Sequence, residues 1–361
     1  MENNYCVIMA GGIGSRFWPM SRTDLPKQFL DILGIGKTLI QQTYERFERI
    51  CPLDNIYIIT NEVYRDKIIR QIPNINPDCI ICEPYRRNTA PCIAYASHKI
   101  IKLNPDANIV VAPSDHLILK EDVFVDCVNM ALEQASKTEC LITMGIKPNR
   151  PDTGYGYIQF INEETLENKD IKKVKVFTEK PDLLIAQQFL DSGDYYWNSG
   201  IFIWNVQSIL NGLDEHLSEV NILFKEGSEL YNTEAEKDFI KDVYAECKNI
   251  SIDYGLMEKA RNVYILCADF GWSDLGTWGS LHSQLEKDHD NNAKVGKKVF
   301  LYDSKDCIVH VPDDKLVLIQ GLDDYIVSES NNVLLICKKE DEQKIKRSLN
   351  DVKSKLDDDF L

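Results

Sequence analysis

Short runs of apolar residues alternate with longer amphipathic stretches along the first 150 residues of the chain. The apolar runs lie at residues 5–10, 55–60, 79–82, 108–112 and 140–145. Helix-like stretches lie at 39–50, 90–103 and 123–137, and Thr89 is the expected cap of the second one. Strands that alternate with helices in this way are typical of parallel βαβ units, whose binding loops share one edge of the sheet.

The pattern changes after about residue 150. Segments rich in aromatic residues and glycine, with helices near 183–191 and 234–245, indicate a second lobe that continues the first. A polar break at 288–292 is followed by short β-like runs at 298–302, 307–311, 316–320 and 333–337. We predict an α/β fold with a mainly parallel, Rossmann-like core over residues 1–290, and a small β-rich domain with a closing helix over 291–361. The spacing of the last runs is compatible with a short β-solenoid.

Charge and composition narrow the function classes. The chain has 361 residues, of which 44% are hydrophobic, and a formal net charge of −16. Such a charge disfavours general binding to nucleic acid or to anionic membranes, so an anionic ligand needs a local basic pocket. The sequence starts without a basic leader and holds no apolar run of about 18 residues, so we expect a cytoplasmic location without membrane contact.

The 11 cysteines are odd in number and dispersed through apolar runs. This pattern indicates reduced thiols in the core rather than a disulfide framework. Cys79 and Cys82 have the spacing of a metal or redox pair, but they stand in a short apolar run with no second pair. A buried strand is the simpler interpretation of this segment.

A glycine-rich turn follows the first predicted strand. Its small residues are Gly11, Gly12, Gly14 and Ser15, and the cations Arg16, Arg22 and Lys27 come next. Backbone with so few side chains lets several N–H groups approach a phosphate chain, and the cations can neutralise that chain. Neither common nucleotide motif fits, because Phe17 replaces the last glycine of the dinucleotide pattern and Asp31 replaces the first glycine of a P-loop.

The stretch from Met9 to Phe29 resembles the signature of the sugar-nucleotide pyrophosphorylases, and specifically of the mannose-1-phosphate guanylyltransferases. The resemblance implies a nucleotidyltransferase core in which the glycine-rich turn wraps the nucleotide. It also implies that Arg16 and Lys27 are catalytic residues that hold the phosphates. The resemblance covers about residues 4–290, in five motifs that occur in the family's order, and extends weakly into the β-rich tail.

Two aspartates occupy the family's metal positions. Asp115 follows the run at 108–112, at the edge of the sheet where ligands bind, and Asp274 lies in a segment that contains two tryptophans. Taken alone, Asp115 would be a helix or turn cap, and the Asp274 segment could equally be a turn that packs its tryptophans. The resemblance implies instead that both bind Mg²⁺, which prefers one or two carboxylates together with phosphate oxygens and water.

Later segments resemble the family's purine and sugar-phosphate sites. Glu83 and Asn88 occupy the purine site, although nothing in the residues themselves distinguishes guanine from another base. The implied sugar-phosphate residues are Gly154, Glu179, Lys180 and Asn198. Lys180 would also act in catalysis, as a point charge on the sugar's phosphate. Taken alone, Glu179 and Lys180 would be a solvated surface pair.

The implied reaction is transfer of GMP from GTP to mannose 1-phosphate, with Mg²⁺ as cofactor. The attacking phosphate is already anionic, so positioning and charge neutralisation suffice and no general base is required. His116, beside Asp115, is not expected to act as a catalytic acid. Two alternatives stay open, namely transfer to another sugar such as glucose or heptose 1-phosphate, and a catalytically silent GDP-mannose sensor. The oligomeric state is also open, a homodimer being one alternative.

Overall fold

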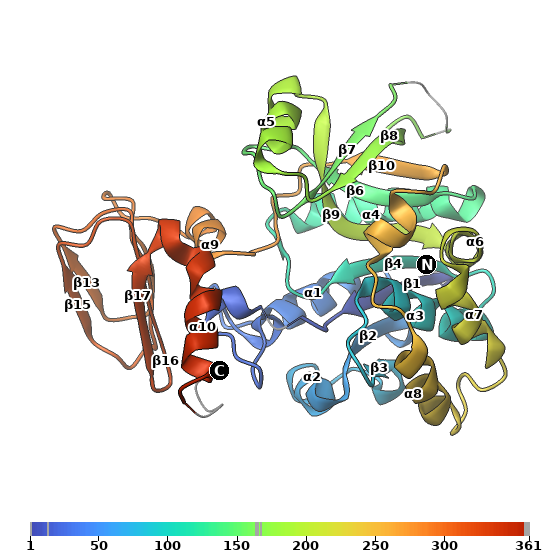
Figure 1. Cartoon of the computed structure of the whole chain (residues 1–361), viewed down its shortest axis with the longest axis horizontal. Coiled ribbons are helices and arrows are strands. Elements are labelled where there is room, and N and C mark those ends of the chain that lie inside the picture. Colours follow the sequence, from blue (N-terminus) through green and yellow to red (C-terminus); the bar gives the residue numbers. More distant parts are fainter. Residues whose placement is uncertain (1, 13, 163–165, 167, 357–361) are drawn as a thin grey trace. The chain divides into compact units, whose positions relative to one another are not determined.

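The computed structural model describes residues 2–12, 14–162, 166 and 168–356 (Figure 1). By their contacts, these residues form two compact units. The first unit is drawn from residues 1–11, 43–114 and 118–272, and the second from residues 12–42, 115–117 and 273–361. Because each unit is assembled from separate stretches, the chain passes between the units repeatedly.

A sheet of nine strands forms the centre of the first unit (Figure 1). In chain order the strands are β1 (Asn4–Met9), β2 (Ile56–Asn61), β3 (Ile80–Glu83), β4 (Asn108–Pro113), β6 (Leu141–Ile146), β7 (Gly156–Phe160), β8 (Ile171–Glu179), β9 (Tyr195–Asn205) and β10 (Val263–Cys267). Their order across the sheet is β3-β2-β1-β4-β9-β6-β10-β8-β7, and β7 also pairs with β9. The five apolar runs predicted as strands before residue 150 are all confirmed.

Only part of this sheet is parallel. β3, β2, β1 and β4 pair in parallel, and so do β6 and β10. β9 runs antiparallel between β4 and β6, and β7 and β8 form only antiparallel pairs. The prediction of a mainly parallel sheet is therefore wrong for β7, β8 and β9, whereas β10 pairs in parallel with β6. Residues 161–170, which connect β7 to β8, are fewer than the roughly dozen residues that a crossover between parallel strands requires.

Helices flank this sheet. In the first unit they are α2 (Arg65–Gln71), α3 (Thr89–Leu103), α4 (Glu121–Lys137), α5 (Leu183–Ser192), α6 (Val206–His216), α7 (Ser218–Glu226) and α8 (Glu236–Glu246), with shorter turns η3 (Leu53–Asn55), η4 (Glu62–Tyr64), η5 (Pro77–Cys79) and η6 (Asp253–Met257). α4 packs against β4, β6 and β9, and α6 packs against α3 and β9. α1 (Leu39–Phe47) contains one passage of the chain between the units.

The cap of α3 is one residue earlier than predicted. Asn88 precedes the helix, with a φ of 71°, and its side chain accepts the N–H of Thr89 at 2.9 Å. The hydroxyl of Thr89 instead accepts the backbone N–H of Ile252 at 2.8 Å. The predicted cap at Thr89 is therefore wrong, because a tertiary contact engages its side chain.

The second unit combines an N-terminal segment with the C-terminal region. Its elements are η1 (Ser15–Phe17), η2 (Lys27–Phe29), α9 (Trp278–Gln284), β12 (Ala293–Val295), β13 (Val299–Tyr302), β14 (Ile308–His310), β15 (Val317–Gln320), β16 (Tyr325–Ser330), β17 (Val333–Lys338), η7 (Lys339–Lys344) and α10 (Ile345–Lys353). β12, β14 and β16 pair in parallel, as do β13 and β15, and β17 pairs antiparallel with β16. β5 (Leu117–Ile118) and β11 (Trp272–Ser273) contain further passages between the units.

A hydrophobic core of the second unit joins the segment after the glycine-rich turn to the C-terminal region. Phe17 from η1 and Trp278 from α9 have ring centroids 5.3 Å apart, and Ile345 from α10 belongs to the same buried cluster. The turn that follows β1 and the last helix of the chain are therefore fixed by shared burial, which is the main stabilising term in folding. All 11 cysteines are free, as predicted. Among the described helices, none combines the length and the apolar character needed to cross a bilayer.

Candidate active site

The glycine-rich turn has one position that only glycine fits. Gly14 has a φ of 69°, and a Cβ on this residue would lie 2.4 Å from the Cβ of Lys27. A side chain would be strained by the backbone and would collide with the lysine. The amide of Gln28 donates to the carbonyl of Gly12 at 3.1 Å, and the hydroxyl of Ser21 donates to the carbonyl of Gly14. The segment that follows the turn therefore holds it in place.

Lys27 connects two of the predicted site segments. Its ammonium group donates to Oδ2 of Asp115 at 3.0 Å and to the backbone carbonyl of Asp274 at 2.6 Å, and only 3% of the residue is exposed. Burial raises the pKa of Asp115, but the charges of Lys27 and His116 outweigh it, so this pKa lies below its usual value. An ionised carboxylate therefore faces a buried ammonium.

A pocket of about 310 Å³ opens beside this ion pair, within the second unit. Arg16, Lys27, Asp115 and Asp274, which the sequence predicted separately, all line it. The side chain of Arg16 is exposed, and within the described ranges no hydrogen bond or ion pair engages its guanidinium. The side chain of Ser15 lies outside the described part of the structure, so its nucleotide-binding role stays a prediction.

The acidic groups of this pocket suit a Mg²⁺ ion that the substrate helps to bind. Asp115 and Asp274 line the pocket, and Oδ1 of Asp274 also accepts the N–H of Gly276 at 2.9 Å. Mg²⁺ is usually held by one or two carboxylates, with substrate phosphates and water completing its coordination. Across the residues that the structure describes, no group of three or more His, Cys, Asp or Glu side chains could hold a metal by itself.

The predicted purine residues lie in the first unit. Glu83 ends β3, is 8% exposed, and accepts the hydroxyl of Tyr244 at 2.8 Å. Its Oε2 lies 3.7 Å from the point where a Cβ on Gly11 would stand, so the carboxyl group faces the start of the glycine-rich turn. Burial raises the pKa of Glu83 to about 7, although the Tyr244 hydrogen bond and the charge of Arg86 oppose the shift. Asn88 is exposed.

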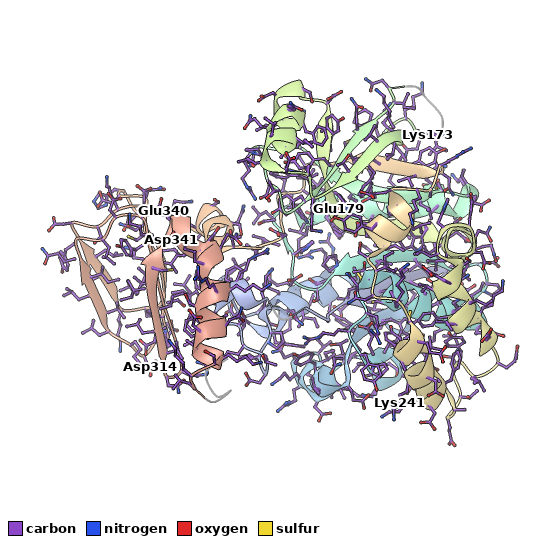
Figure 2. All side chains as sticks on the ribbon, viewed as in Figure 1. Lys173, Glu179, Lys241, Asp314, Glu340 and Asp341 are labelled. Carbon is purple, nitrogen blue, oxygen red and sulfur yellow. The ribbon has the colours of Figure 1, made fainter. Side chains whose placement is uncertain are left out.

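A second polar cluster in the first unit forms where β8 ends at Glu179 (Figure 2). Lys180 pairs with the carboxylate of Glu179. The other oxygen of that carboxylate, Oε2, is buried and has no hydrogen-bond partner in the part of the chain that the structure describes, and a Cβ on Gly156 would lie 2.4 Å from it. A buried acceptor without a partner is costly, so this oxygen is suited to a ligand that brings a donor. Gly154, exposed in the turn before β7, donates its N–H to Asp152 at 2.8 Å.

The same cluster contains Asp253, which the sequence analysis missed. The amide of Asn198 donates to Asp253 at 2.9 Å, and its oxygen accepts the hydroxyl of Thr143 at 2.8 Å. Burial and the charge of Glu179 raise the pKa of Asp253 to about 6, against the opposing effect of Lys180. Asp253 begins the short π-helix η6, and such turns are frequent at functional sites. A lone aspartate between apolar residues gave no signal in the sequence beyond that of a helix cap.

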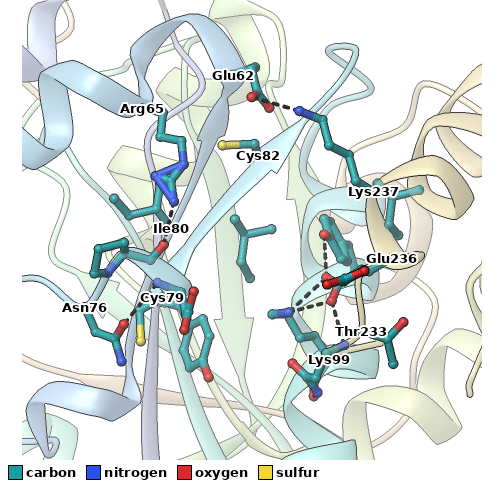
Figure 3. Close-up of a pocket in the computed structure, with 18 of the residues that line it drawn as sticks. Glu62, Arg65, Asn76, Cys79, Ile80, Cys82, Lys99, Thr233, Glu236 and Lys237 are labelled. Atoms are coloured by element: carbon teal, nitrogen blue, oxygen red, sulfur yellow. Dashed lines mark hydrogen bonds and ion pairs between the residues drawn. The ribbon is translucent and has the colours of Figure 1, made fainter. Parts of the chain in front are cut away.

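A larger pocket, of about 950 Å³, lies along the edge strand β3 of the first unit (Figure 3). Two ion pairs lie in its lining. Lys99 donates to both oxygens of Glu236 at 2.9 and 2.7 Å, and Lys237 donates to Glu62 at 3.2 Å. Of the predicted site residues that the structure describes, none lines this pocket. We therefore assign no ligand to it.

The predicted residues thus fall into groups that each belong to one unit. The second unit gathers Gly12, Gly14, Arg16, Lys27, Asp115 and Asp274. The first unit contains Gly11, Glu83 and Asn88, and it also contains Gly154, Glu179, Lys180 and Asn198. The described contacts join Gly11 to Glu83, and Glu179 to Lys180. Asn198 joins the second of these clusters through Asp253.

Two protein-family models match this chain. The sequence model of the nucleotidyl transferase family matches residues 5–291, and that of a MannoseP isomerase/GMP-like beta-helix domain matches residues 296–351. The mannose-1-phosphate guanylyltransferase of Klebsiella pneumoniae is 35% identical over 348 residues, which cover 95% of this chain and 72% of that protein. The alginate biosynthesis protein AlgA of Pseudomonas fluorescens is 36% identical over 356 residues, covering 96% of this chain and 71% of that protein.

A solved structure has a similar fold. The crystal structure of a protein from Thermus thermophilus, described as a mannose-1-phosphate geranyltransferase, superposes with a TM-score of 0.86 at 27% identity. The superposition covers 97% of this chain and 99% of that one. The similarity therefore extends through both the sheet of the first unit and the C-terminal strands.

The raised pKa of Glu83 predicts a pH-dependent stability. Between its ordinary value of 4.5 and about 7, the folded protein binds a proton that the unfolded chain releases, so stability falls as pH rises through this window. The full shift corresponds to roughly 3 kcal/mol. Glu83→Gln stays neutral, so the variant should unfold at a higher urea concentration than the wild type at pH 8 and at a similar one at pH 5.

The matched control is Glu246→Gln, which changes an exposed glutamate at the end of α8. Urea unfolding of this variant should follow the wild type at both pH values. Equal midpoints for Glu83→Gln and the wild type at pH 8 would show that the buried Glu83 carboxyl does not carry the expected penalty.

Proposed function

The chain belongs to the nucleotidyl transferase family, among the mannose-1-phosphate guanylyltransferases, and we propose that it transfers GMP from GTP to α-D-mannose 1-phosphate, releasing pyrophosphate. The observation that carries this proposal is the pocket in which Lys27 contacts Asp115 and Asp274 while Arg16 lines the wall. Arg16 and Lys27, together with two carboxylates around the same pocket, suit a triphosphate bound with a divalent metal.

In this proposal the glycine-rich turn and its cations bind the triphosphate. Backbone N–H groups of Gly11, Gly12, Gly14 and Ser15 approach the phosphate oxygens, and Arg16 and Lys27 neutralise their charge. Asp115 and Asp274 would hold Mg²⁺, which supplies further charge neutralisation when the substrates are bound. The local positive charge is needed because the chain as a whole carries a net charge of −16.

Glu83 accounts for a preference for guanine. Guanine presents two neighbouring N–H donors, at N1 and N2, whereas adenine presents an acceptor at N1. When it is ionised, the Glu83 carboxylate, which faces the glycine-rich turn, can accept both guanine donors and offers adenine no matching donor. Asn88, five residues further along, is the second residue that we propose for base recognition.

The cluster at the end of β8 is the proposed site of the sugar phosphate. Among the described residues, Oε2 of Glu179 lacks a partner and can accept a sugar hydroxyl, and Asn198 can contribute its amide. Lys180 would hold the phosphate of the sugar as a point charge. Asp253 positions Asn198 through their hydrogen bond, and Gly154 belongs to the adjoining turn.

The proposed reaction is an in-line displacement at the α-phosphorus of GTP. An oxygen of mannose 1-phosphate forms the new P–O bond while the bond to the bridging oxygen of the β-phosphate breaks, and pyrophosphate leaves with that bond's electron pair. The nucleophile is already anionic, so positioning by Lys180 and charge neutralisation by Arg16 and Lys27 replace a general base. His116 lines the pocket but has no proton to transfer in this scheme.

We also propose domain boundaries, a cellular location and binding partners. We assign the catalytic domain to residues 1–290 and a short β-solenoid to residues 291–361, which the parallel pairing of β12, β14 and β16 and the beta-helix match support. We place the protein in the cytoplasm, with GTP and a sugar 1-phosphate as its ligands and without nucleic-acid or membrane partners. A homodimer is compatible with these assignments.

The proposal predicts pyrophosphate release that depends on both substrates. Purified protein is incubated with GTP, magnesium and separate sugar 1-phosphates, and release is measured beside controls without magnesium and with ATP. We expect release with mannose 1-phosphate and GTP. Release with glucose or heptose 1-phosphate alone would keep the mechanism and correct the substrate. Tight GDP-mannose binding without release under any condition would identify a sensor and contradict the catalytic assignments.

Replacement of the buried ammonium should reduce turnover strongly. Lys27→Ala removes a charge at a developing phosphate anion, and loss of such a group costs on the order of 3 kcal/mol, or about 10²-fold in kcat. Lys298→Ala, which removes an exposed lysine of the same unit, is the control and should retain wild-type turnover. With folding verified by circular dichroism, near-normal turnover of Lys27→Ala would remove Lys27 from the mechanism.

A further inference from the structure

The last helix of the chain places a cation in the nucleotide pocket. Lys346, the second residue of α10, lines the 310 Å³ pocket together with Arg16, Lys27, Asp115 and Asp274. The other lining residues all lie before residue 277, so Lys346 is the one contribution from the C-terminal strands and helix among the described lining residues. The resemblance on which the site was predicted gives this residue no role.

Packing on either side of Lys346 fixes its position. Ile345, directly before it, is 3% exposed and lies in the core that contains Phe17 and Trp278, and Leu349 packs against the same core one turn later. The carboxylate of Glu342 accepts the backbone N–H of Gly279 at 2.9 Å, which ties η7 to the first turn of α9. α10 also contacts η1, the turn that carries Arg16. The backbone of Lys346 is therefore held beside the glycine-rich turn.

The cations of the pocket differ in what they already bind. Lys27 is buried and engaged by Asp115 and Asp274. Lys346 is exposed, and in the described part of the chain no hydrogen bond or ion pair engages its ammonium group. The guanidinium of Arg16 is likewise exposed, and no hydrogen bond or ion pair within the described residues engages it. The pocket thus holds two cations that are free to meet an anionic ligand, one from each end of the chain.

We propose that Lys346 binds the β- and γ-phosphates of GTP, and hence the pyrophosphate that leaves. This rests on the proposed function and adds a phosphate-binding residue to it. Lys27 is buried and Lys346 is exposed in the lining of the same pocket, so a triphosphate that contacts Lys27 near the reacting phosphorus can extend its terminal phosphates to Lys346. An ammonium on a flexible stem can follow pyrophosphate as it departs.

The proposal predicts a larger loss of affinity for ligands that carry the terminal phosphates than for ligands that lack them. Lys346→Ala should weaken GTP binding, measured by calorimetry, and raise the KM for pyrophosphate in the reverse reaction, each about tenfold, which corresponds to about 1.4 kcal/mol. Binding of GDP-mannose, which lacks the γ-phosphate and the leaving group, should change less than twofold. Lys346→Arg keeps the charge and should restore most of the GTP and pyrophosphate affinity.

Arg347→Ala is the matched control, because it removes a neighbouring exposed cation that does not line the pocket. Equal effects of Lys346→Ala and Arg347→Ala would overturn the proposal, since they would indicate only a change in overall charge. Equal weakening of GTP and GDP-mannose by Lys346→Ala would also overturn it, in favour of a structural role for α10. A wild-type protein that neither turns over nor binds GTP would refute the proposed function itself, and the role of Lys346 with it.

Discussion

The buried ammonium of Lys27 is the interaction on which the nucleotide pocket depends. A lysine with 3% exposure is stable only with close partners, and it finds them in the carboxylate of Asp115 and the carbonyl of Asp274. Asp115 lies 88 residues after Lys27 and Asp274 lies 247 residues after it. One ion pair therefore brings three distant segments to one place, and its charges match those of a triphosphate with a divalent metal. Gly14 completes the arrangement, because any side chain there would displace Lys27.

The C-terminal strands and helix belong to this pocket rather than standing apart from it. The cluster around Phe17 and Trp278 includes Ile308, Ile326 and Ile345, so the segment after the glycine-rich turn is buried against the C-terminal region. Burial of that segment therefore depends on the C-terminal region. This gives the β-rich part a direct role in holding Arg16 and Lys27, and the same packing carries Lys346 to the pocket.

The sequence was sufficient to predict what depends on local pattern. Apolar runs predicted the strands before residue 150, and glycines followed by cations predicted a turn whose cations Arg16 and Lys27 line one pocket. Residues whose role depends on tertiary contacts could not be predicted from the sequence. Asp253 was missed because its function rests on Asn198 and Glu179, 55 and 74 residues away in the chain. The antiparallel part of the sheet was not predicted. The direction of a strand depends on how the chain connects it to its neighbours, and the short aromatic segments after residue 150 do not indicate these connections.

The wrong cap at Thr89 also results from a tertiary contact. The backbone N–H of Ile252 donates to the Thr89 hydroxyl, and Asn88 caps the helix instead. The proposed metal and purine residues rest on resemblance, since a lone aspartate or glutamate after a strand has several structural explanations. What the structure adds is the set of contacts around them. Asp115 is paired with Lys27, and Glu83 is buried beside Gly11 with a raised pKa.

The central claim is that a GMP group passes from GTP to mannose 1-phosphate. The most direct measurement follows radioactive phosphorus from GTP labelled at either the α- or the γ-position, in the presence of mannose 1-phosphate and magnesium. The account predicts that the α-label appears in GDP-mannose and that the γ-label appears only in pyrophosphate. A γ-label transferred to the sugar, or an α-label that never enters GDP-mannose and is found instead in free GMP or GDP, would contradict it.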